Sequence, residues 1–109
     1  MDEREERIGR NEALFRDLNE RVKDVDARFG YPVDGEFLCE CGNRECVERV
    51  TVPLEEYERV RSDSTTFIVK NGHEQADVES IVAEHDDHVV VQKRAGTPAR
   101  VATETDPRS

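Results

Sequence analysis

The sequence predicts an α+β fold, in which a long amphipathic helix precedes a small domain of short strands and two short helices held together by zinc. Three observations support this prediction. Apolar residues recur at heptad spacing over residues 2–29, short β-branched runs alternate with turn residues from 31 to 93, and all three cysteines lie between Cys39 and Cys46. The first pattern is typical of a helix, the second of short strands and the third of a metal site.

The N-terminal segment is predicted to be one long helix, because residues 2–29 contain no proline and Gly9 as their only glycine. Its apolar residues follow each other at intervals of three or four, which places them on one narrow stripe. Asn11 falls on the same stripe, where a polar side chain would set the register against a second copy. The stripe can pack on the chain's own domain or pair with another helix, and both alternatives remain open. We call this stripe the apolar seam, and it comprises Ile8, Phe15, Leu18, Val22, Val25 and Phe29.

The rest of the chain divides at changes in composition. Residues 1–30 are expected to be the amphipathic helix, 31–93 the zinc-binding α+β domain, and 94–109 a flexible tail, since few large apolar residues follow Arg94. The predicted elements of the domain are strands at 37–39 and 47–52 that form a hairpin around the cysteines, a helix at 53–61, a strand at 66–69, a tight turn at 70–73, a short helix at about 75–84 and a last strand at 89–93.

Composition narrows the possible functions. Of the 109 residues, 35% are hydrophobic and 39% are charged, and a domain this small and polar usually needs an added cross-link such as a metal. The net charge of −10 argues against sequence-independent binding to nucleic acid or to an anionic membrane. The charged N-terminal residues do not resemble a signal peptide, and no apolar run is long enough to span a membrane. We therefore expect a cytoplasmic protein, whose thiols stay reduced and available to a metal.

The cysteines form the pattern C-x-C-x4-C, with Cys39, Cys41 and Cys46 at the defined positions. An odd number of cysteines cannot pair completely in disulfides, whereas three thiolates are three-quarters of a tetrahedral zinc site. Such a site needs backbone amides turned toward the sulfur atoms. Gly42 permits the positive φ that a turn of this kind can use.

The fourth ligand is predicted to be His73, which follows Gly72 in a tight turn between two elements. His85 and His88 flank an acidic pair and are weaker candidates, and water or a residue of another chain remains an alternative. A protein ligand would close the site and make it structural, whereas water would leave a position open for catalysis.

Residues 39–46 resemble the post-SET motif of lysine methyltransferases, in which C-x-C-G is followed after three residues by a cysteine. In that family the three cysteines bind zinc together with a remote cysteine. The resemblance covers eight residues and implies the mode of metal binding, not methyl transfer. Because this chain has no further cysteine, the resemblance implies that a histidine takes the place of the remote cysteine.

A larger part of the sequence resembles a group of short, acidic, uncharacterised proteins of high-GC Gram-positive bacteria that carry a C-x-C-G-x3-C cluster. This resemblance implies a cytoplasmic bacterial setting and supplies no reaction. It extends over Phe37–Cys46, Glu56–Arg61, Gly72–Glu74, Val89–Val91 and Thr105–Arg108.

We therefore expect a small zinc-binding protein that is not an enzyme and acts as a protein-interaction or regulatory module. Its partner would be another protein, or a second copy bound through the N-terminal helix. One alternative is a zinc-dependent hydrolase or deaminase-like enzyme with three thiolates, an open position and Glu74 as proton carrier. Another is a redox sensor based on the thiols or on an iron–sulfur cluster, which three cysteines and a histidine can also bind.

Overall fold

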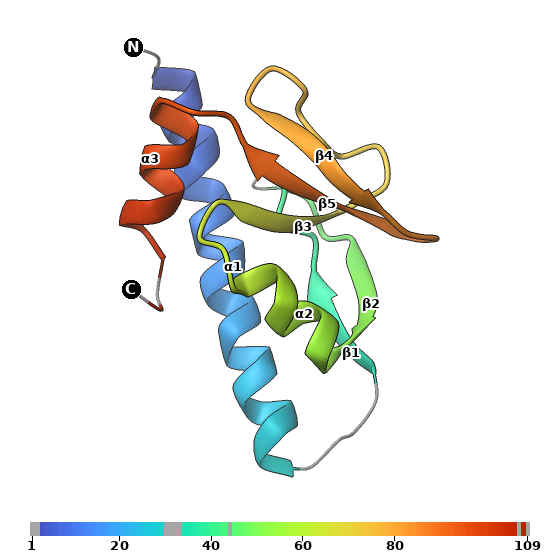
Figure 1. Ribbon diagram of the computed structural model, residues 1–109. Coiled ribbons are helices and arrows are strands. Elements are labelled where there is room, and N and C mark those ends of the chain that lie inside the picture. The colour runs from blue at the N-terminus through green and yellow to red at the C-terminus, as the bar shows by residue number, and fades with distance from the viewer. Residues whose placement is uncertain (1–2, 30–33, 44, 107, 109) are drawn as a thin grey trace.

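The computed structural model confirms the α+β class (Figure 1). The structure describes residues 3–29, 34–43, 45–106 and 108, without the side chains of residues 25–29 and 34–35. In that part of the chain, no helix is both long and apolar enough to cross a membrane. The elements are α1 (Glu3–Phe29), β1 (Asp34–Leu38), β2 (Arg49–Pro53), α2 (Leu54–Arg61), β3 (Thr66–Lys70), β4 (Glu79–Glu84), β5 (His88–Lys93) and α3 (Thr97–Glu104).

Two small antiparallel sheets form the β part of the fold. β1 and β2 make the predicted hairpin, with Phe37 opposite Val50, and the second sheet has the strand order β3-β5-β4. The register of β4 against β5 shifts between Ile81 and Ala83, which marks an irregularity in the edge strand. The backbone N–H of Glu40 donates to the carbonyl of Ile68 at 2.8 Å. This bond joins the chain leaving β1 to strand β3 and so connects the two separate sheets.

The two faces of the three-stranded sheet bury different cores, because successive side chains of a strand point to opposite faces. On one face, side chains of β3 and β5 pack with Cys39, Cys41 and Ala102 of α3. On the other face, Ile68 packs with the hairpin and with Tyr57 of α2. The rings of Phe37 and Tyr57 are stacked there, with centroids 4.2 Å apart. The cysteines therefore lie on the face opposite α2.

Helix α1 packs along its own domain, against α3 and β1 (Figure 1). Ile8 and Phe15 are buried, and Leu18 and Val22 are half-buried. The side chains of Val25 and Phe29, which complete the apolar seam, lie outside the described residues. The sequence left two alternatives open, and the described part of the seam follows the first of them: it packs on the chain's own domain.

The buried face of α1 is also strongly polar, which the sequence analysis did not predict. Glu12, Arg16 and Asn19 have no exposed side-chain surface. Nζ of Lys93 lies 2.6 Å from Glu12 and 2.8 Å from Glu79, and Arg16 lies over the ring of Phe67 while it donates to two backbone carbonyls. We call this set the buried ionic layer, and it comprises Glu12, Arg16, Asn19, Glu40, Arg61, Glu79 and Lys93.

The predicted helix at 75–84 is wrong, because residues 79–84 form strand β4. Helical spacing would have placed Val78, Ile81 and Val82 on one buried face. In the structure Val78 is buried, whereas Ile81 and Val82 are 41% and 52% exposed on an edge strand. β-branched residues favour a strand where a partner such as β5 is in reach, and this long-range pairing overrides the local pattern.

The predicted flexible tail after Arg94 also differs from the structure, since residues 97–104 form α3. Pro98 occupies the first turn, where its missing N–H costs nothing, and Val101 is buried against α1. Gly9 allows this close contact, because a Cβ there would lie 2.6 Å from Cγ1 of Val101. The segment is therefore held on the domain by Val101 against Gly9 and by Ala102, which packs with side chains of β3 and β5.

Candidate metal centre

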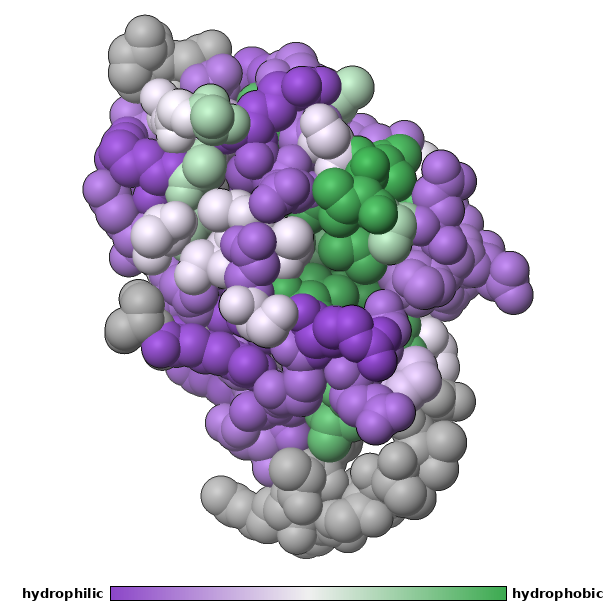
Figure 2. Space-filling view, viewed as in Figure 1, coloured by the Kyte–Doolittle hydropathy of each residue, from purple (hydrophilic) through white to green (hydrophobic). Residues whose placement is uncertain are grey.

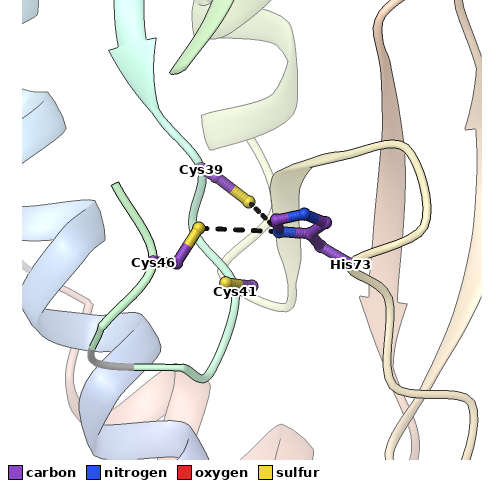
Figure 3. A group of neighbouring side chains, drawn as sticks. All are labelled: Cys39, Cys41, Cys46 and His73. Carbon is purple, nitrogen blue, oxygen red and sulfur yellow. Dashed lines mark hydrogen bonds between the residues drawn. The ribbon is translucent and has the colours of Figure 1, made fainter. Parts of the chain in front are cut away.

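The structure brings together the four residues that the sequence analysis proposed as ligands. Cys39 and Cys41 follow β1, Cys46 precedes β2, and His73 lies in the turn after β3 (Figure 3). One potential ligand atom from each lies within 4.8 Å of all the others. Segments separated by about thirty residues thus converge on one point, with the histidine ring directed at the sulfur atoms.

The extended chain from Cys39 to Cys41 explains why both thiols point to the same side. Residues two apart share a face in an extended segment, so Glu40 between them points the opposite way. Its carboxylate is completely buried and accepts hydrogen bonds from Asn19 Nδ2 at 2.8 Å, Ile68 N at 3.1 Å and the Tyr57 hydroxyl at 3.2 Å. Burial raises the pKa of Glu40, and the hydrogen bonds from Asn19 and Ile68 oppose the rise. Glu40 therefore anchors the cysteine loop to α1, α2 and β3.

In the sequence, Glu40 is marked only by its position between two cysteines. The alternation of an extended C-x-C segment was the signal available, because it predicts that the middle side chain faces away from the metal. An acidic residue in that position needs buried donors, and Asn19 on α1 supplies one of them.

The turn that carries His73 depends on Gly72, whose φ of 87° lies in the left-handed region that favours glycine. The N–H of His73 donates to the carbonyl of Lys70 at 2.9 Å and closes the turn. The carboxylate of Glu74 accepts from the N–H of Gly72 at 3.1 Å. This bond places Glu74 in the turn itself, where it supports the backbone that presents the histidine.

Two distances test whether the cluster fits a tetrahedral ion. Nδ1 of His73 lies 3.6 Å from Sγ of Cys39 and 3.5 Å from Sγ of Cys46. A tetrahedron with a metal–sulfur bond of about 2.3 Å and a metal–nitrogen bond of about 2.1 Å has a sulfur–nitrogen edge of about 3.6 Å. Both edges therefore have the length that a single zinc ion requires.

Backbone N–H groups point at all three sulfur atoms. The N–H of Lys70 donates to Sγ of Cys39 at 3.1 Å. The N–H groups of Asn43 and Glu48 hydrogen-bond to Cys41 and Cys46, each two residues further along the chain. Hydrogen bonds of this kind favour the thiolate form, which is the form that binds a metal.

The three thiols are also coupled to one another. A hydrogen bond from the Cys39 thiol, supported by the N–H of Asn43 and opposed by burial, lowers the pKa of Cys41 to about 5. The same thiol–thiol bond raises the pKa of Cys39, and burial raises that of Cys46. A divalent cation would reverse the last two shifts, because it favours all three thiolates together.

Gly42 has a different role from the one expected. Among the described residues, only Gly72 and Gly96 have a positive φ, so the turn after Cys41 does not use the left-handed region. A Cβ at Gly42 would lie 2.5 Å from Cγ2 of Ile8 and 2.8 Å from Nε2 of Gln75. The carbonyl of Gly42 also accepts from Asn11 Nδ2 at 3.0 Å. Glycine is needed here because the loop packs tightly against α1.

The site lies close to the surface. A shallow depression beside it is lined by Cys41, Asn43, Gly72, His73 and Gln75. Cys39 and Cys41 are buried and Cys46 is half-buried, so an ion could reach the site through this opening. The other two candidate ligands, His85 and His88, lie near Glu56 instead of near the cysteines.

Comparison with family models, with curated proteins and with solved structures gives no match for this chain. The geometry of the site is therefore the basis for assigning a function. That geometry shows three cysteines and one histidine within metal-binding distance of one another.

Proposed function

We propose that the protein binds one zinc ion in a closed structural site formed by Cys39, Cys41, Cys46 and His73. The observation that carries this proposal is the convergence of the four ligand atoms within 4.8 Å, with two sulfur–nitrogen distances of 3.5 and 3.6 Å. Zinc bound there would connect the β1–β2 hairpin to the turn after β3. The ion would thereby supply part of the stability that a chain with 35% hydrophobic residues lacks.

The donor set favours zinc over other metals. Three thiolates and an imidazole in a tetrahedral arrangement suit zinc, whereas magnesium and calcium require oxygen ligands. In an iron–sulfur cluster the protein ligands bind different iron atoms, so a set of ligands spaced for a single ion favours zinc over a cluster. The resemblance of residues 39–46 to the post-SET motif, which binds zinc, supports the same choice.

The geometry favours a structural role over catalysis. Four protein ligands occupy a tetrahedral site completely and leave no position for the water that a zinc hydrolase activates. Glu74, the candidate proton carrier of the enzymatic alternative, accepts a hydrogen bond from Gly72 within the turn. Both observations support a zinc ion that holds the fold together.

The biological role that we propose is a cytoplasmic protein-interaction or regulatory module. Ile8 and Phe15 of the apolar seam are buried on this chain, so the seam does not favour a partner in this conformation. The exposed side chains of Ile81 and Val82 on the edge strand β4 are a better basis for a protein partner. Figure 2 shows apolar surface on the sheet side of the molecule.

Metal binding can be tested by cobalt substitution, because cobalt bound to thiolates has intense absorption bands. We expect the purified chain to bind cobalt with these bands and to lose them when zinc is added. His73→Ala should weaken binding at least about tenfold and lower the melting temperature, since a ligand and a structural cross-link are lost together. Glu74→Gln is the matched control and should keep both properties. A His73→Ala variant with unchanged affinity and stability would contradict the closed site.

A further inference from the structure

We propose that the protein has a second metal site of different chemistry, in which Glu56, His85 and His88 bind a divalent first-row transition ion. Glu56 is on α2, His85 lies between β4 and β5, and His88 begins β5. One potential ligand atom from each lies within 4.8 Å of the other two. Two imidazoles and a carboxylate suit zinc, nickel or copper, and the site contains no thiolate.

The distance between Glu56 and His85 is close to that between two ligand atoms of one metal ion. Oε2 of Glu56 lies 3.5 Å from Nε2 of His85. In a tetrahedral site with bonds of about 2.0–2.1 Å, the distance between two ligand atoms is about 3.4 Å. The other carboxylate oxygen, Oε1, pairs with the exposed guanidinium of Arg59 at 2.6 Å. Oε2 therefore remains directed at His85 while Oε1 is held.

His88 provides an independent reason to expect a ligand. Its side chain is 6% exposed, and its Nδ1 lies 2.7 Å from Oδ1 of Asp87. Because the carboxylate of Asp87 accepts that bond, Nδ1 carries the proton. Nε2 is buried and has no hydrogen-bond partner among the described residues. A buried ring nitrogen without a partner is costly in either protonation state, whereas a metal ion would satisfy its lone pair.

The contact with Asp87 is the arrangement that metal-binding histidines usually have. A ligating imidazole commonly donates its other N–H to a carboxylate, which fixes the tautomer and the orientation of the ring. The rings of His85 and His88 are stacked, with centroids 4.6 Å apart. His85 is 40% exposed, so its side chain can adjust to an ion that enters from solvent.

The second site is separate from the cysteines. Val89 and Val91 of β5 pack with Cys39 and Cys41 on one face of the sheet. Because side chains alternate along a strand, His88 points to the other face, where α2 and Glu56 lie. Zinc at the cysteines and an ion at Glu56, His85 and His88 would therefore occupy opposite faces. With three protein ligands, the second site keeps a position open for water or a small ligand.

Nickel titration of the chain already loaded with one zinc ion tests this proposal. We expect calorimetry to show one further ion bound per chain, and paramagnetic nickel to broaden the ring proton signals of His85 and His88 more than those of His73. His85→Ala and His88→Ala should each weaken nickel binding at least about tenfold. Glu55→Gln, which changes the exposed carboxylate next to Glu56, is the matched control and should bind nickel within about twofold of the parent chain.

Two results would overturn the proposal. One is that the zinc-loaded chain does not bind nickel, and the other is that His85→Ala binds nickel with the same affinity as the parent chain. The exposed His85 is the decisive position, because its removal should leave the fold intact even if His88→Ala does not fold. The thiolate bands of cobalt should be unchanged in His85→Ala. Failure of the second site would thus be distinguished from failure of the zinc site.

Discussion

The cysteine loop and the buried ionic layer both replace apolar contacts that this chain lacks, but they do so by different means. In the loop, Cys39, Cys41 and Cys46 converge with His73 on one point, with the spacing of a tetrahedral ion. In the ionic layer, ionisable side chains from α1, α2, β4 and β5 contact one another directly, as Lys93 does with Glu12 and Glu79. Glu40 belongs to both regions, since it separates two cysteines and accepts from Asn19 of α1.

The two regions differ in the source of their stability. The loop would gain its stability from an ion that can be removed, so its contribution should vary with metal concentration. The ionic layer depends on complete pairing, because a buried charge without a partner is far more costly than a missing apolar contact. Four experiments can separate these contributions, in order of decreasing expected effect.

Loss of the metal should have the largest effect. With free zinc at about a thousand times the dissociation constant, binding stabilises the folded state by about 4 kcal/mol, and a chelator or Cys41→Ser should remove this contribution. We expect the melting temperature to fall by at least about 15 °C for a domain of this size, measured by circular dichroism. An equal melting temperature with and without chelator would show that the loop is stable without an ion.

Lys93→Met should destabilise the ionic layer by about 3 kcal/mol, because it leaves Glu12 and Glu79 buried together without a cation. Urea unfolding at fixed zinc concentration measures this change. Lys93→Met combined with Glu12→Gln and Glu79→Gln is the control, and it should recover most of the loss since none of these three positions then carries a charge. If the single variant were as stable as the parent, the layer would not depend on pairing.

Gly42→Ala tests the contact between the loop and α1. The added methyl would lie 2.5 Å from Cγ2 of Ile8, and we expect a loss of about 2 kcal/mol as the loop moves away. Ile8→Ala removes the clashing atom, so the double variant should lose less than the sum of the two single changes. Additive effects in thermal unfolding would indicate that the two residues do not touch.

The pH dependence of stability should show the smallest effect. Burial raises the pKa of Glu12 from 4.5 to about 8, and the neighbouring Lys93 opposes this shift. The folded state then binds the proton more tightly than the unfolded state, so stability falls as the pH rises from about 4.5 through 8.

Glu12→Gln should remove this dependence, which amounts to about 1 kcal/mol between pH 6 and pH 7. The measurement is the difference in unfolding free energy between the variant and the parent at each pH, because the thiols contribute equally to both. A difference that stays constant across this range would contradict the raised pKa.

Patterns local in the sequence predicted much of the fold and the candidate site. The hairpin, α2, β3, β5 and the proposed ligands Cys39, Cys41, Cys46 and His73 all follow from spacing, turn residues and the chemistry of zinc. Strand β4 and helix α3 could not be predicted in this way, because each depends on a partner distant in sequence: β5 in one case and α1 in the other.

The buried ionic layer and the cluster of Glu56, His85 and His88 could not be predicted for a related reason. Nothing in their local spacing distinguishes Glu12, Arg16 or Lys93 from solvent-exposed charges. Glu56 and His88 are brought together only by the packing of α2 on the sheet. A sequence with so many charges gives no local signal of which ones are buried.

X-ray absorption at the zinc edge of the chain loaded with one zinc ion tests the central claim most directly. The structure predicts three sulfur neighbours at about 2.3 Å and one nitrogen neighbour at about 2.0 Å, with the features of an imidazole ring in the outer shell. The nitrogen should be lost from the first shell in His73→Ala and retained in Glu74→Gln. A first shell with fewer than three sulfur atoms would contradict the proposed site. A His73→Ala spectrum identical to that of the parent chain would also contradict it.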